Sequence, residues 1–250
     1  MLIPNSSAAD ITDLQRADLF RDMTATELNT ILAAGRRHRA SVGEFLFHQG
    51  DPARYLYITL SGRVKLVQIT HDGQQVLVRY IGPGETFAML AVLQGARYPV
   101  AAQVVQDCVS FMWDGPTMKQ LMAAYPQLER NALRIMAERV QEFQDRVREL
   151  ATERVERRIA RALLRLARQT GRRIEEGVLI DLPLSRQDLA EMAGTTLYTV
   201  SRTLKKWEEH GLVKSSRARV TITYPHGLVI IAEDLPPDTP PAVDEEPPFA

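Results

Sequence analysis

The chain has 250 residues and no net charge, and 45% of its residues are hydrophobic and 25% charged. This composition is typical of a globular protein and excludes a disordered or collagen-like chain. Cys108 is the only cysteine in the sequence. We expect this side chain to be buried. A single cysteine excludes a disulfide scaffold and disfavours an iron–sulfur cluster held by one chain. Neither a membrane span nor a signal peptide is recognisable, so we expect a cytoplasmic protein.

The net charge of zero conceals an uneven distribution. Residues 1–151 carry 16 basic and 16 acidic side chains. Residues 152–231 carry 15 basic and 9 acidic side chains, and residues 232–250 carry 6 acidic side chains and no basic ones. A basic segment of this size indicates a separate domain that faces a polyanion, although a solvated charged surface is the alternative.

After a short N-terminal arm, the first large segment has the pattern of an antiparallel sheet. Thr24 and Glu27 predict the start of a short helix. Beyond it, short apolar runs alternate with turn residues such as Ser61 and Gly62, and this pattern predicts a β-sandwich or β-roll. The predicted strands are 45–47, 55–60, 64–69, 76–81, 100–105 and 109–113.

After Pro116 the apolar residues follow a helical period. Six of them are spaced by 3, 4, 3, 4 and 3 residues, which is the narrow seam of a coiled-coil helix and predicts a homodimer. Packing of this helix on its own strands is the alternative, and both can hold on different faces. The seam residues are Leu133, Met136, Val140, Phe143, Val147 and Leu150.

The basic segment begins with a predicted helix over 152–169 and a hairpin at 175–177, and then contains a helix-turn-helix pattern. Ser185 and Asp188 form a capping box in sequence, and Gly194 ends the first short helix. Thr195 is placed to cap the second helix.

The spacing within this pattern is specific. Ala190 is small enough for close helix crossing, Gly194 makes the turn four residues later, and Val200 buries the second helix six residues after that. The open face of the second helix carries polar residues that packing alone does not require. They are Thr195, Thr196, Tyr198, Ser201, Arg202 and Lys205. A basic hairpin at 213–220 follows in the position of a wing, and together these features predict DNA binding.

The region from residue 20 to 231 resembles the transcription-regulator family of the cyclic-AMP receptor protein and the fumarate and nitrate reductase regulator (Crp/Fnr). The order of β-roll, long helix and winged helix-turn-helix is the order found in that family. The glycine spacing of the strand region also matches, in Gly43-Glu44, Gly50-Asp51, Tyr57-Ile58, Gly62-Arg63-Val64, Gly73 and Gly84.

The resemblance implies an α+β protein in five parts. We expect an N-terminal arm over 1–19, a jelly-roll effector domain like a cyclic-nucleotide-binding domain over 20–115, a dimerisation helix over 116–151, a DNA-binding domain over 152–233 and a disordered, acidic and proline-rich tail over 234–250. It also implies a homodimer on a two-fold symmetric DNA site with half-sites about 34 Å apart. An activator that contacts RNA polymerase is the expected role.

Arg202 matches the arginine with which the family reads guanine, and Ser201 matches a recognition residue of its redox-sensing branch. Tyr198, preceded by Leu197, stands where both archetypes have a glutamate, so we expect a different half-site. The residues expected to contact DNA are Arg186, Thr195, Thr196, Leu197, Tyr198, Ser201, Arg202, Lys205, Arg217 and Arg219.

In cyclic-nucleotide-binding members, a Gly-Glu pair holds the ribose and an Arg-Ser pair holds the phosphate. These pairs fall on Ala88-Met89 and Tyr98-Pro99, and a purine-facing threonine falls on Phe143. A cyclic phosphate would be desolvated there without polar partners, so the effector is not expected to be cyclic AMP. The expected effector pocket contains Met89, Arg97, Tyr98, Pro99 and Phe143.

Residues 97–99 and 194–202 also resemble the branch that responds to nitrogen oxides. A haem-dependent sensor of nitric oxide or redox state is therefore an alternative, with His38, His48 or His71 as axial ligands. These histidines can equally be ordinary surface residues without a ligand role. A pocket that holds no effector is a further alternative. The four-cysteine cluster of the oxygen-sensing branch is absent, so an iron–sulfur centre is not expected, and no other metal site is predicted.

No nucleophile elbow, phosphate-binding loop or paired metal ligands occur, and we do not expect an enzyme. A ligand-binding regulatory module without DNA binding is the alternative class. It would share the roll but would lack Ala190, Gly194, Val200 and the basic wing.

Overall fold

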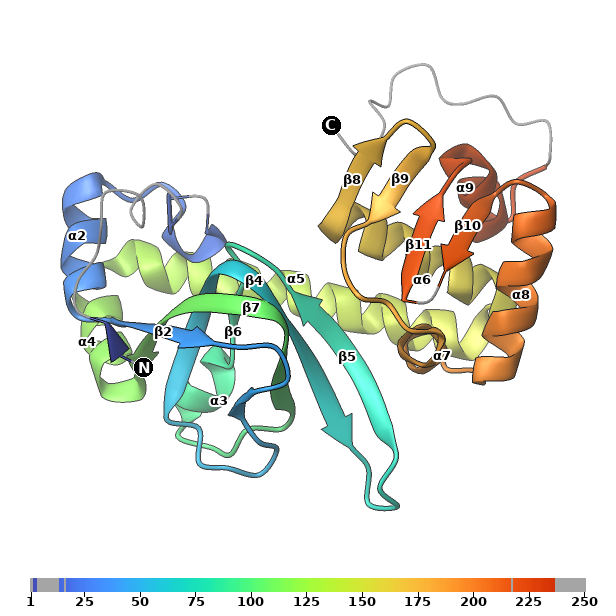
Figure 1. Cartoon of the computed structure of the whole chain (residues 1–250). Helices are drawn as coiled ribbons and strands as arrows, with labels where there is room; N and C mark the ends of the chain where they lie inside the picture. Colours follow the sequence, from blue (N-terminus) through green and yellow to red (C-terminus); the bar gives the residue numbers. More distant parts are fainter. Residues whose placement is uncertain (1, 4–13, 16, 217, 237–250) are drawn as a thin grey trace. The chain divides into compact units, whose positions relative to one another are not determined.

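The computed structural model describes residues 2–3, 14–15, 17–216 and 218–236. The chain divides into two compact units, Met1–Phe143 and Gln144–Ala250 (Figure 1). The fold is α+β as predicted: an antiparallel roll, a long helix and a winged helix-turn-helix. Among the described helices, none is long and apolar enough to cross a membrane.

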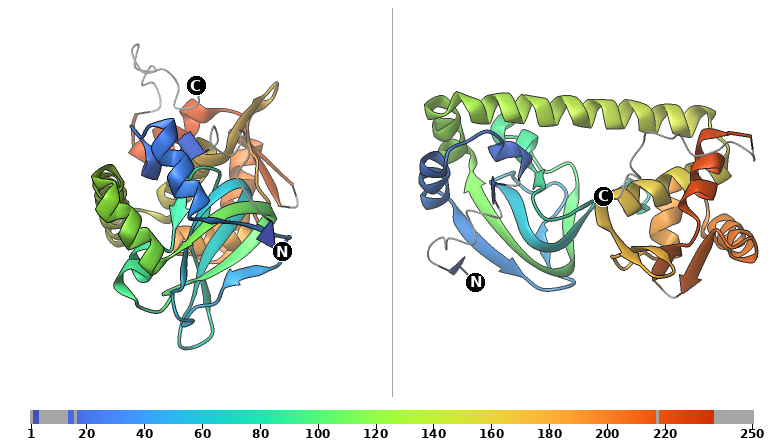
Figure 2. Two further views of the ribbon diagram at one scale, coloured as in Figure 1. Left: turned by 90° about the vertical axis from the view of Figure 1, so that its left-hand side faces the viewer. Right: turned by 90° about the horizontal axis from the view of Figure 1, so that it is seen from above.

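The N-terminal unit is built on a seven-stranded antiparallel sheet, in which β1, β2, β7, β4 and β5 lie in that order, β3 pairs with β7, and β6 pairs with β4. The strands curl around an apolar interior (Figure 2). They are β1 (Leu2–Ile3), β2 (Arg36–Ala40), β3 (Phe45–Phe47), β4 (Tyr55–Ile69), β5 (Gln75–Ile81), β6 (Thr86–Phe87) and β7 (Ala101–Asp114). Leu2 pairs with His38, so the start of the predicted arm belongs to the sheet.

The two longest strands, β4 and β7, each combine two of the predicted strands. Ser61 and Gly62, expected to form a turn, lie within β4, where the pairing with β7 shifts register. A bulge of this kind needs the same residue types as a turn but keeps the strand continuous. Gly62 has φ +80°, and a Cβ there would lie 2.1 Å from the carbonyl oxygen of Asp107, so only glycine fits.

The helices of the N-terminal unit frame the roll. They are η1 (Asp18–Phe20), α2 (Ala25–Ala33), α3 (Met89–Gln94), α4 (Gly115–Ala124) and α5 (Pro126–Thr152), whose last residues belong to the second unit. The predicted capping box of α2 is confirmed: the Glu27 amide donates to Thr24 Oγ1 at 3.3 Å, and the Thr24 amide donates to Glu27 Oε2 at 2.7 Å.

The segment 116–151, expected as one helix, is two helices that meet at Tyr125. This residue precedes Pro126 and has φ −126° and ψ 84°. A residue before proline is pushed out of the helical region, which explains the break. From Pro126 onward α5 is one continuous helix (Figure 2).

The core of the N-terminal unit is centred on Trp113, which is 1% exposed. Its indole nitrogen donates to the carbonyl oxygen of Ile31 at 2.8 Å, so β7 is attached to α2. Cys108 is 3% exposed, as expected for a buried thiol.

The C-terminal unit contains the predicted helix-turn-helix and wing. Its four-stranded antiparallel sheet has the order β10, β11, β9, β8. The elements are α6 (Val155–Thr170), β8 (Gly171–Ile174), β9 (Gly177–Ile180), α7 (Arg186–Ala193), α8 (Leu197–Glu209), β10 (Val213–Ser216), β11 (Arg219–Ile222) and α9 (Pro225–Glu233). Helix α6 begins three residues later than predicted, and residues 237–250 of the predicted tail lie outside the described residues.

Candidate nucleic-acid interface and ligand cavity

The turn between α7 and α8 has the predicted chemistry. The Asp188 amide donates to Ser185 Oγ at 3.0 Å, and the Ser185 amide donates to Asp188 Oδ2 at 3.1 Å, which completes the capping box. Gly194 ends α7 in the left-handed conformation with φ 58°. Two backbone groups at the end of α7 are thereby satisfied within the turn.

The start of α8 differs by one residue from the expectation. Thr196, not Thr195, is the N-cap, and its Oγ1 accepts from the Thr199 amide at 3.2 Å. The Thr195 amide donates to the carbonyl oxygen of Ala190 at 3.0 Å, so Thr195 closes α7 instead.

Helix α8 has one buried and one exposed face. Val200, Leu204 and Trp207 are at most 1% exposed. Tyr198 is 73% exposed, and Arg202 is also exposed, one helical turn later. Because residues three and four apart lie on one helix face, Tyr198, Ser201, Arg202 and Lys205 form a continuous polar surface, with Leu197 (49% exposed) at its start.

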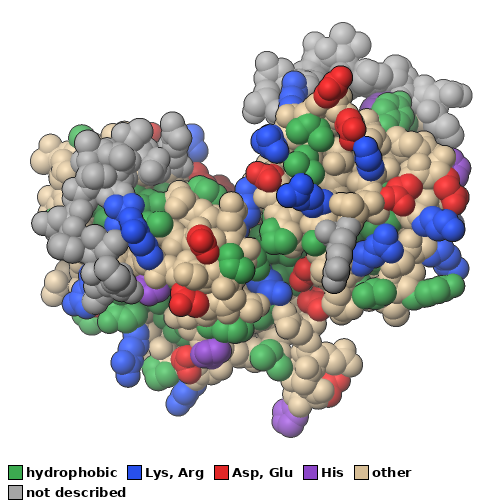
Figure 3. Space-filling model, viewed as in Figure 1, with side chains coloured by type: hydrophobic (Ala, Val, Ile, Leu, Met, Phe, Trp, Pro, Cys, Tyr) green, Lys and Arg blue, Asp and Glu red, His purple; other side chains and the backbone are tan. Residues whose placement is uncertain are grey.

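The cations on and beside this surface have no acidic partner within the part of the chain that the structure describes. Arg186, Arg202, Lys205 and Arg219 make no ion pair with any described residue. Nearby cations behave differently. Lys206 Nζ lies 3.1 Å from Glu156, and Lys214 Nζ lies 2.9 Å from Glu176. Figure 3 shows several Lys and Arg side chains over α8 and the β10–β11 hairpin, with Asp and Glu side chains among them.

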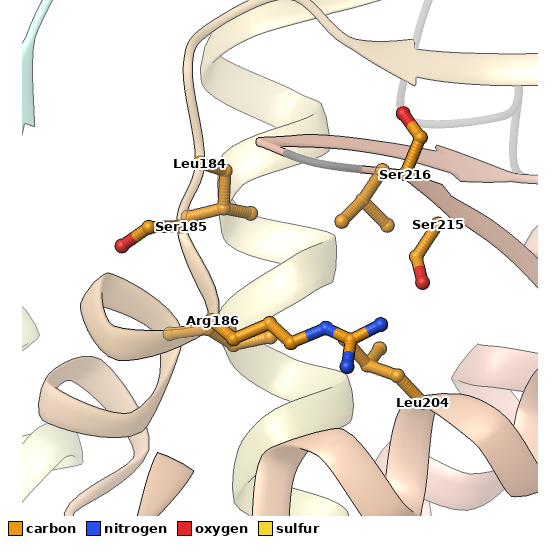
Figure 4. Close-up of a pocket in the computed structure, with 8 residues that line it drawn as sticks. Leu184, Ser185, Arg186, Leu204, Ser215 and Ser216 are labelled. Atoms are coloured by element: carbon orange, nitrogen blue, oxygen red, sulfur yellow. The ribbon is translucent and has the colours of Figure 1, made fainter.

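The wing is fixed to α8 by Glu208, whose Oε1 accepts from both the amide and the hydroxyl of Ser215 at 2.6 Å. Arg186 extends from the start of α7 toward Ser215 and Leu204 across a small recess (Figure 4). The recess has a volume of about 10 Å³, which is room for one water molecule. Arg217 lies outside the described residues.

The last turns of α5 are joined to α6 by an ion pair and to α7 by a hydrogen bond, and α6 is bonded to the turn after α7. Glu149 is 5% exposed, and both its carboxylate oxygens accept from Arg165 Nη1, at 2.7 and 2.8 Å. Arg146 donates to the carbonyl oxygen of Met192, and Arg158 donates to that of Gly194 at 3.1 Å. Burial, with Arg165 nearby, lowers the pKa of Arg146 to about 10.

Along α5, five of the six seam residues are exposed. Leu133 is 71% exposed, Val140 56% and Phe143 69%, and Val147 and Leu150 are 49% and 43% exposed. Met136 differs, because it packs against the core of the N-terminal unit. Leu128, Ala132 and Ile135 are buried on the other face of the helix. The alternative that α5 packs on its own strands is therefore confirmed for the buried face, and the seam face is exposed, with its pairing in a dimer a prediction.

The N-terminal unit contains a cavity of about 210 Å³. It is lined by Phe47, Leu66, Arg79, Ile81, Thr86, Phe87, Ala88, Met89, Leu90, Ala91, Tyr98, Pro99, Val100, Ile135, Met136 and Arg139. Of the predicted pocket residues, Met89, Tyr98 and Pro99 line it. Arg97 does not, because it is exposed and donates to the carbonyl oxygen of Gly50 at 2.6 Å. Phe143 does not either, because it lies on the exposed face of α5.

Two arginines that sequence reasoning missed bring charge to this cavity. Arg79 comes from β5 and pairs with Glu85, and Arg139 comes from α5, with Nη1 2.8 Å from Glu142 and Nη2 3.6 Å from Glu85. Burial lowers the pKa of Arg79, whereas Glu85 acts in the opposite direction. The two residues are 60 positions apart, and the sequence carries no local signal that joins them.

The tyrosine of the predicted pocket is held rigidly. Tyr98 OH donates to the carbonyl oxygen of Tyr55 at 2.7 Å and accepts from the Tyr55 amide at 3.0 Å. Its ring stacks on Phe47 with centroids 3.7 Å apart. Its hydroxyl is thus occupied by protein groups.

The cavity does not fit haem. Pockets for drug-sized or larger ligands measure about 300–1,000 Å³, and no histidine or cysteine lines this smaller cavity. His38 is on β2, His48 stacks on Phe45 at 4.6 Å, and His71 is in the turn between β4 and β5. Among the described residues, no cluster of three or more His, Cys, Asp or Glu side chains is arranged to hold a metal ion.

Comparison with known proteins assigns both units. Residues 37–125 match the model of the cyclic nucleotide-binding domain, and residues 157–230 match that of the Crp-like helix-turn-helix domain. The Cyclic AMP receptor protein of Thermus thermophilus is 28% identical over 209 residues, which cover 84% of this chain and 94% of the relative. Transcriptional activator protein FnrA of Stutzerimonas stutzeri is 27% identical over 212 residues, which cover 85% of each chain.

A solved structure supports the fold. FixK2 from Bradyrhizobium japonicum superposes with a TM-score of 0.69 at 21% identity, over 79% of this chain and 96% of that chain.

Proposed function

Because the chain belongs to the Crp/Fnr family of transcription regulators, we propose that it is a homodimer that binds a two-fold symmetric DNA site and that its N-terminal unit controls this binding. In this proposal α8 enters the major groove, the β10–β11 wing contacts the backbone, and the half-sites lie about 34 Å apart.

The observation that carries the proposal is the exposed face of α8. Arg202 and Lys205 lie one turn apart on it without acidic partners among the described residues, while Val200 and Leu204 fix the helix from below. A guanidinium free of ion pairs can donate two parallel hydrogen bonds to guanine O6 and N7. Arg186 and Arg219 are placed at the start of α7 and on the wing, where backbone phosphates would be neutralised.

The apolar seam of α5 supports the dimer. Leu133, Val140 and Phe143 are more than half exposed, and a second copy of the same helix would bury this repeat of apolar residues. The junction of Glu149 with Arg165 would then carry a change in α5 to the DNA-binding elements.

We further propose that the effector is not cyclic AMP, since Met89, Tyr98 and Pro99 line the cavity where the family holds ribose and phosphate. Activation through RNA polymerase is the regulatory role we assign.

Binding to genomic fragments tests the proposal. Fragments retained by the full chain are sequenced, and the site is then measured as a labelled duplex by fluorescence anisotropy at several salt concentrations. We expect a palindromic site and weaker binding at high salt. Arg202→Ala should weaken binding about 5- to 150-fold per half-site and relax one base-pair position. Lys206→Ala is the matched control on the same helix, because Lys206 is paired with Glu156. Retention of random sequence, or an equal loss on all sequences with Arg202→Ala, would contradict the assignment.

A further inference from the structure

The size of the cavity in the N-terminal unit limits what it can hold. Its volume of about 210 Å³ exceeds that of an engineered protein cavity of about 150 Å³ that binds benzene, and it is below the usual range for drug-sized ligands. A single ring with a small substituent, or an alkyl chain of similar volume, fits this space.

Most of the wall is apolar and rigid. Phe47, Ile81, Phe87 and Met89 are at most 6% exposed and line the cavity. Phe87 also stacks on Tyr57 with ring centroids 5.2 Å apart. Such a wall favours the apolar body of a ligand through burial and not through hydrogen bonds.

The charged residues of the wall are Arg79 and Arg139. Their partners, Glu85 and Glu142, balance this charge but do not line the cavity. Arg79 is bound to Glu85 and lies 3.7 Å from Glu142, and Arg139 lies 2.8 Å from Glu142 and 3.6 Å from Glu85. Glu85 is drawn away from the cavity by a second bond, in which its Oε2 accepts from the Gly82 amide at 2.7 Å. A guanidinium has five N–H donors, so both arginines keep donors beyond those used by these carboxylates.

Thr86 also lines the cavity, but its Oγ1 is buried and is not accessible from the cavity. Arg79 and Arg139 are therefore the groups of the wall that can bind a charged part of a ligand.

From these observations we infer that the cavity binds a small organic carboxylate with an apolar body of about one ring, its carboxylate held by Arg79 and Arg139. A bidentate contact between guanidinium and carboxylate supplies the affinity that an apolar molecule of this size lacks. This inference specifies the effector of the proposed regulator. Binding of the carboxylate does not depend on the proposed function, but its effect on DNA binding does.

That consequence follows from the elements that carry the two arginines. Arg79 is on β5 and Arg139 is on α5, so one carboxylate would join the sheet to the helix that bears the seam. It would compete with Glu142, which lies on α5 three residues after Arg139 and is bound by it at 2.8 Å. Binding is therefore expected to change the position of α5 and, through it, the affinity for DNA.

Isothermal titration calorimetry on the full chain tests the ligand class. The probes are benzoate and hexanoate, with benzamide and hexanamide as neutral counterparts of the same shape. We expect at least one of the two carboxylates to bind with a Kd of about 10 μM to 1 mM, and about 10- to 100-fold more tightly than its amide. Binding of neither carboxylate, or equal binding of carboxylate and amide, would overturn the inference.

Two variants locate the site. Arg139→Gln should weaken carboxylate binding at least tenfold, whereas Arg134→Gln, on the same helix and outside the cavity lining, should not change it. Unchanged affinity in Arg139→Gln would place any carboxylate site elsewhere and overturn the inference.

Anisotropy with the selected DNA site separates this inference from the proposed function. Carboxylate binding without any DNA binding would support the inference and contradict the proposed function. DNA binding without carboxylate binding would support the proposed function and overturn the inference.

Discussion

Leu150 fills the space in which a side chain at Gly194 would begin. A Cβ built on Gly194 would lie 2.6 Å from Leu150 Cδ2, closer than such atoms approach in proteins. The end of α5 therefore packs directly on the turn of the helix-turn-helix. Glycine is favoured at position 194 by its φ of 58°, and a larger residue would also have to displace the Leu150 side chain.

Gly194→Ala should lower the free energy of unfolding by about 1–2 kcal/mol, about 1 kcal/mol from the left-handed backbone and the smaller part from displacing Leu150 Cδ2, the end of a side chain that is 43% exposed. Gly211→Ala is the matched control. Gly211 has φ 68° in the same unit, but nothing lies within 4 Å of its Cβ position, so only the backbone cost of about 1 kcal/mol applies. Urea denaturation of both variants measures the difference. Adding Leu150→Ala should recover part of the loss in Gly194→Ala and none in Gly211→Ala, and equal losses in the two glycine variants would contradict the contact.

Local signals explain why the DNA-binding elements could be predicted from the sequence. Ser185, Asp188 and Gly194 act on residues within four positions of themselves, so the capping box and the turn can be read from spacing alone. The N-cap of α8 could not be predicted in this way, because Thr195 and Thr196 both have the required hydroxyl. The hydrogen bond from the Thr195 amide to the carbonyl oxygen of Ala190 decides between them, because it makes Thr195 part of the end of α7.

Non-local contacts were not predictable in the same way. Gly62 has the sequence signal of a turn, but its fit against the backbone of Asp107 makes it a bulge in a continuous strand. The cavity arginines, Arg79 and Arg139, come together only through the packing of α5 on the roll. The family resemblance predicted Met89 and Tyr98 as pocket residues, because they fall at positions of the family's ligand-binding motif. It could not predict these two arginines, because they lie outside that motif.

Glu149→Ala should be among the more damaging substitutions in the C-terminal unit. Its carboxylate is 5% exposed and bound by Arg165, which is itself one-third exposed, with Arg161 at 3.9 Å. Loss of one partner leaves a partly buried cation without compensation, and we expect about 2–3 kcal/mol of destabilisation in urea denaturation. Asp145→Ala is the control on the same helix. Asp145 pairs with Arg148 and both side chains are exposed, so the free energy of unfolding should change by no more than about 0.5 kcal/mol. A loss at Glu149 as small as that at Asp145 would show that the pair does not hold α5 to the unit.

Ala88→Gly should stabilise the protein. Ala88 has φ 64°, and a left-handed alanine costs about 1 kcal/mol relative to glycine. The family resemblance predicts that a glycine of the cyclic-nucleotide-binding motif falls at this position. We expect a gain of about 0.5–1 kcal/mol in urea denaturation. Ala96→Gly, in the following loop and without a positive φ, should instead destabilise slightly through chain entropy. If both substitutions destabilise, the left-handed conformation at residue 88 carries no strain.

Cys108 should make stability fall at alkaline pH. Burial raises the pKa of its thiol, while hydrogen bonds to Ser110 and Thr59 oppose that shift. The unfolded chain then loses its proton at about pH 8.5 while the folded chain keeps it, so the contribution is complete below that pH and is lost as the pH rises toward the folded pKa. The slope is at most about 1.4 kcal/mol per pH unit and should be absent in Cys108→Ala, measured by urea denaturation between pH 7 and 9, below the range in which tyrosines and Arg146 titrate. Labelling by a thiol reagent at pH 8 should be negligible in the native protein and complete in urea, because the thiol is 3% exposed. Rapid labelling of the native protein, or the same slope in Cys108→Ala, would assign the pH dependence to other groups.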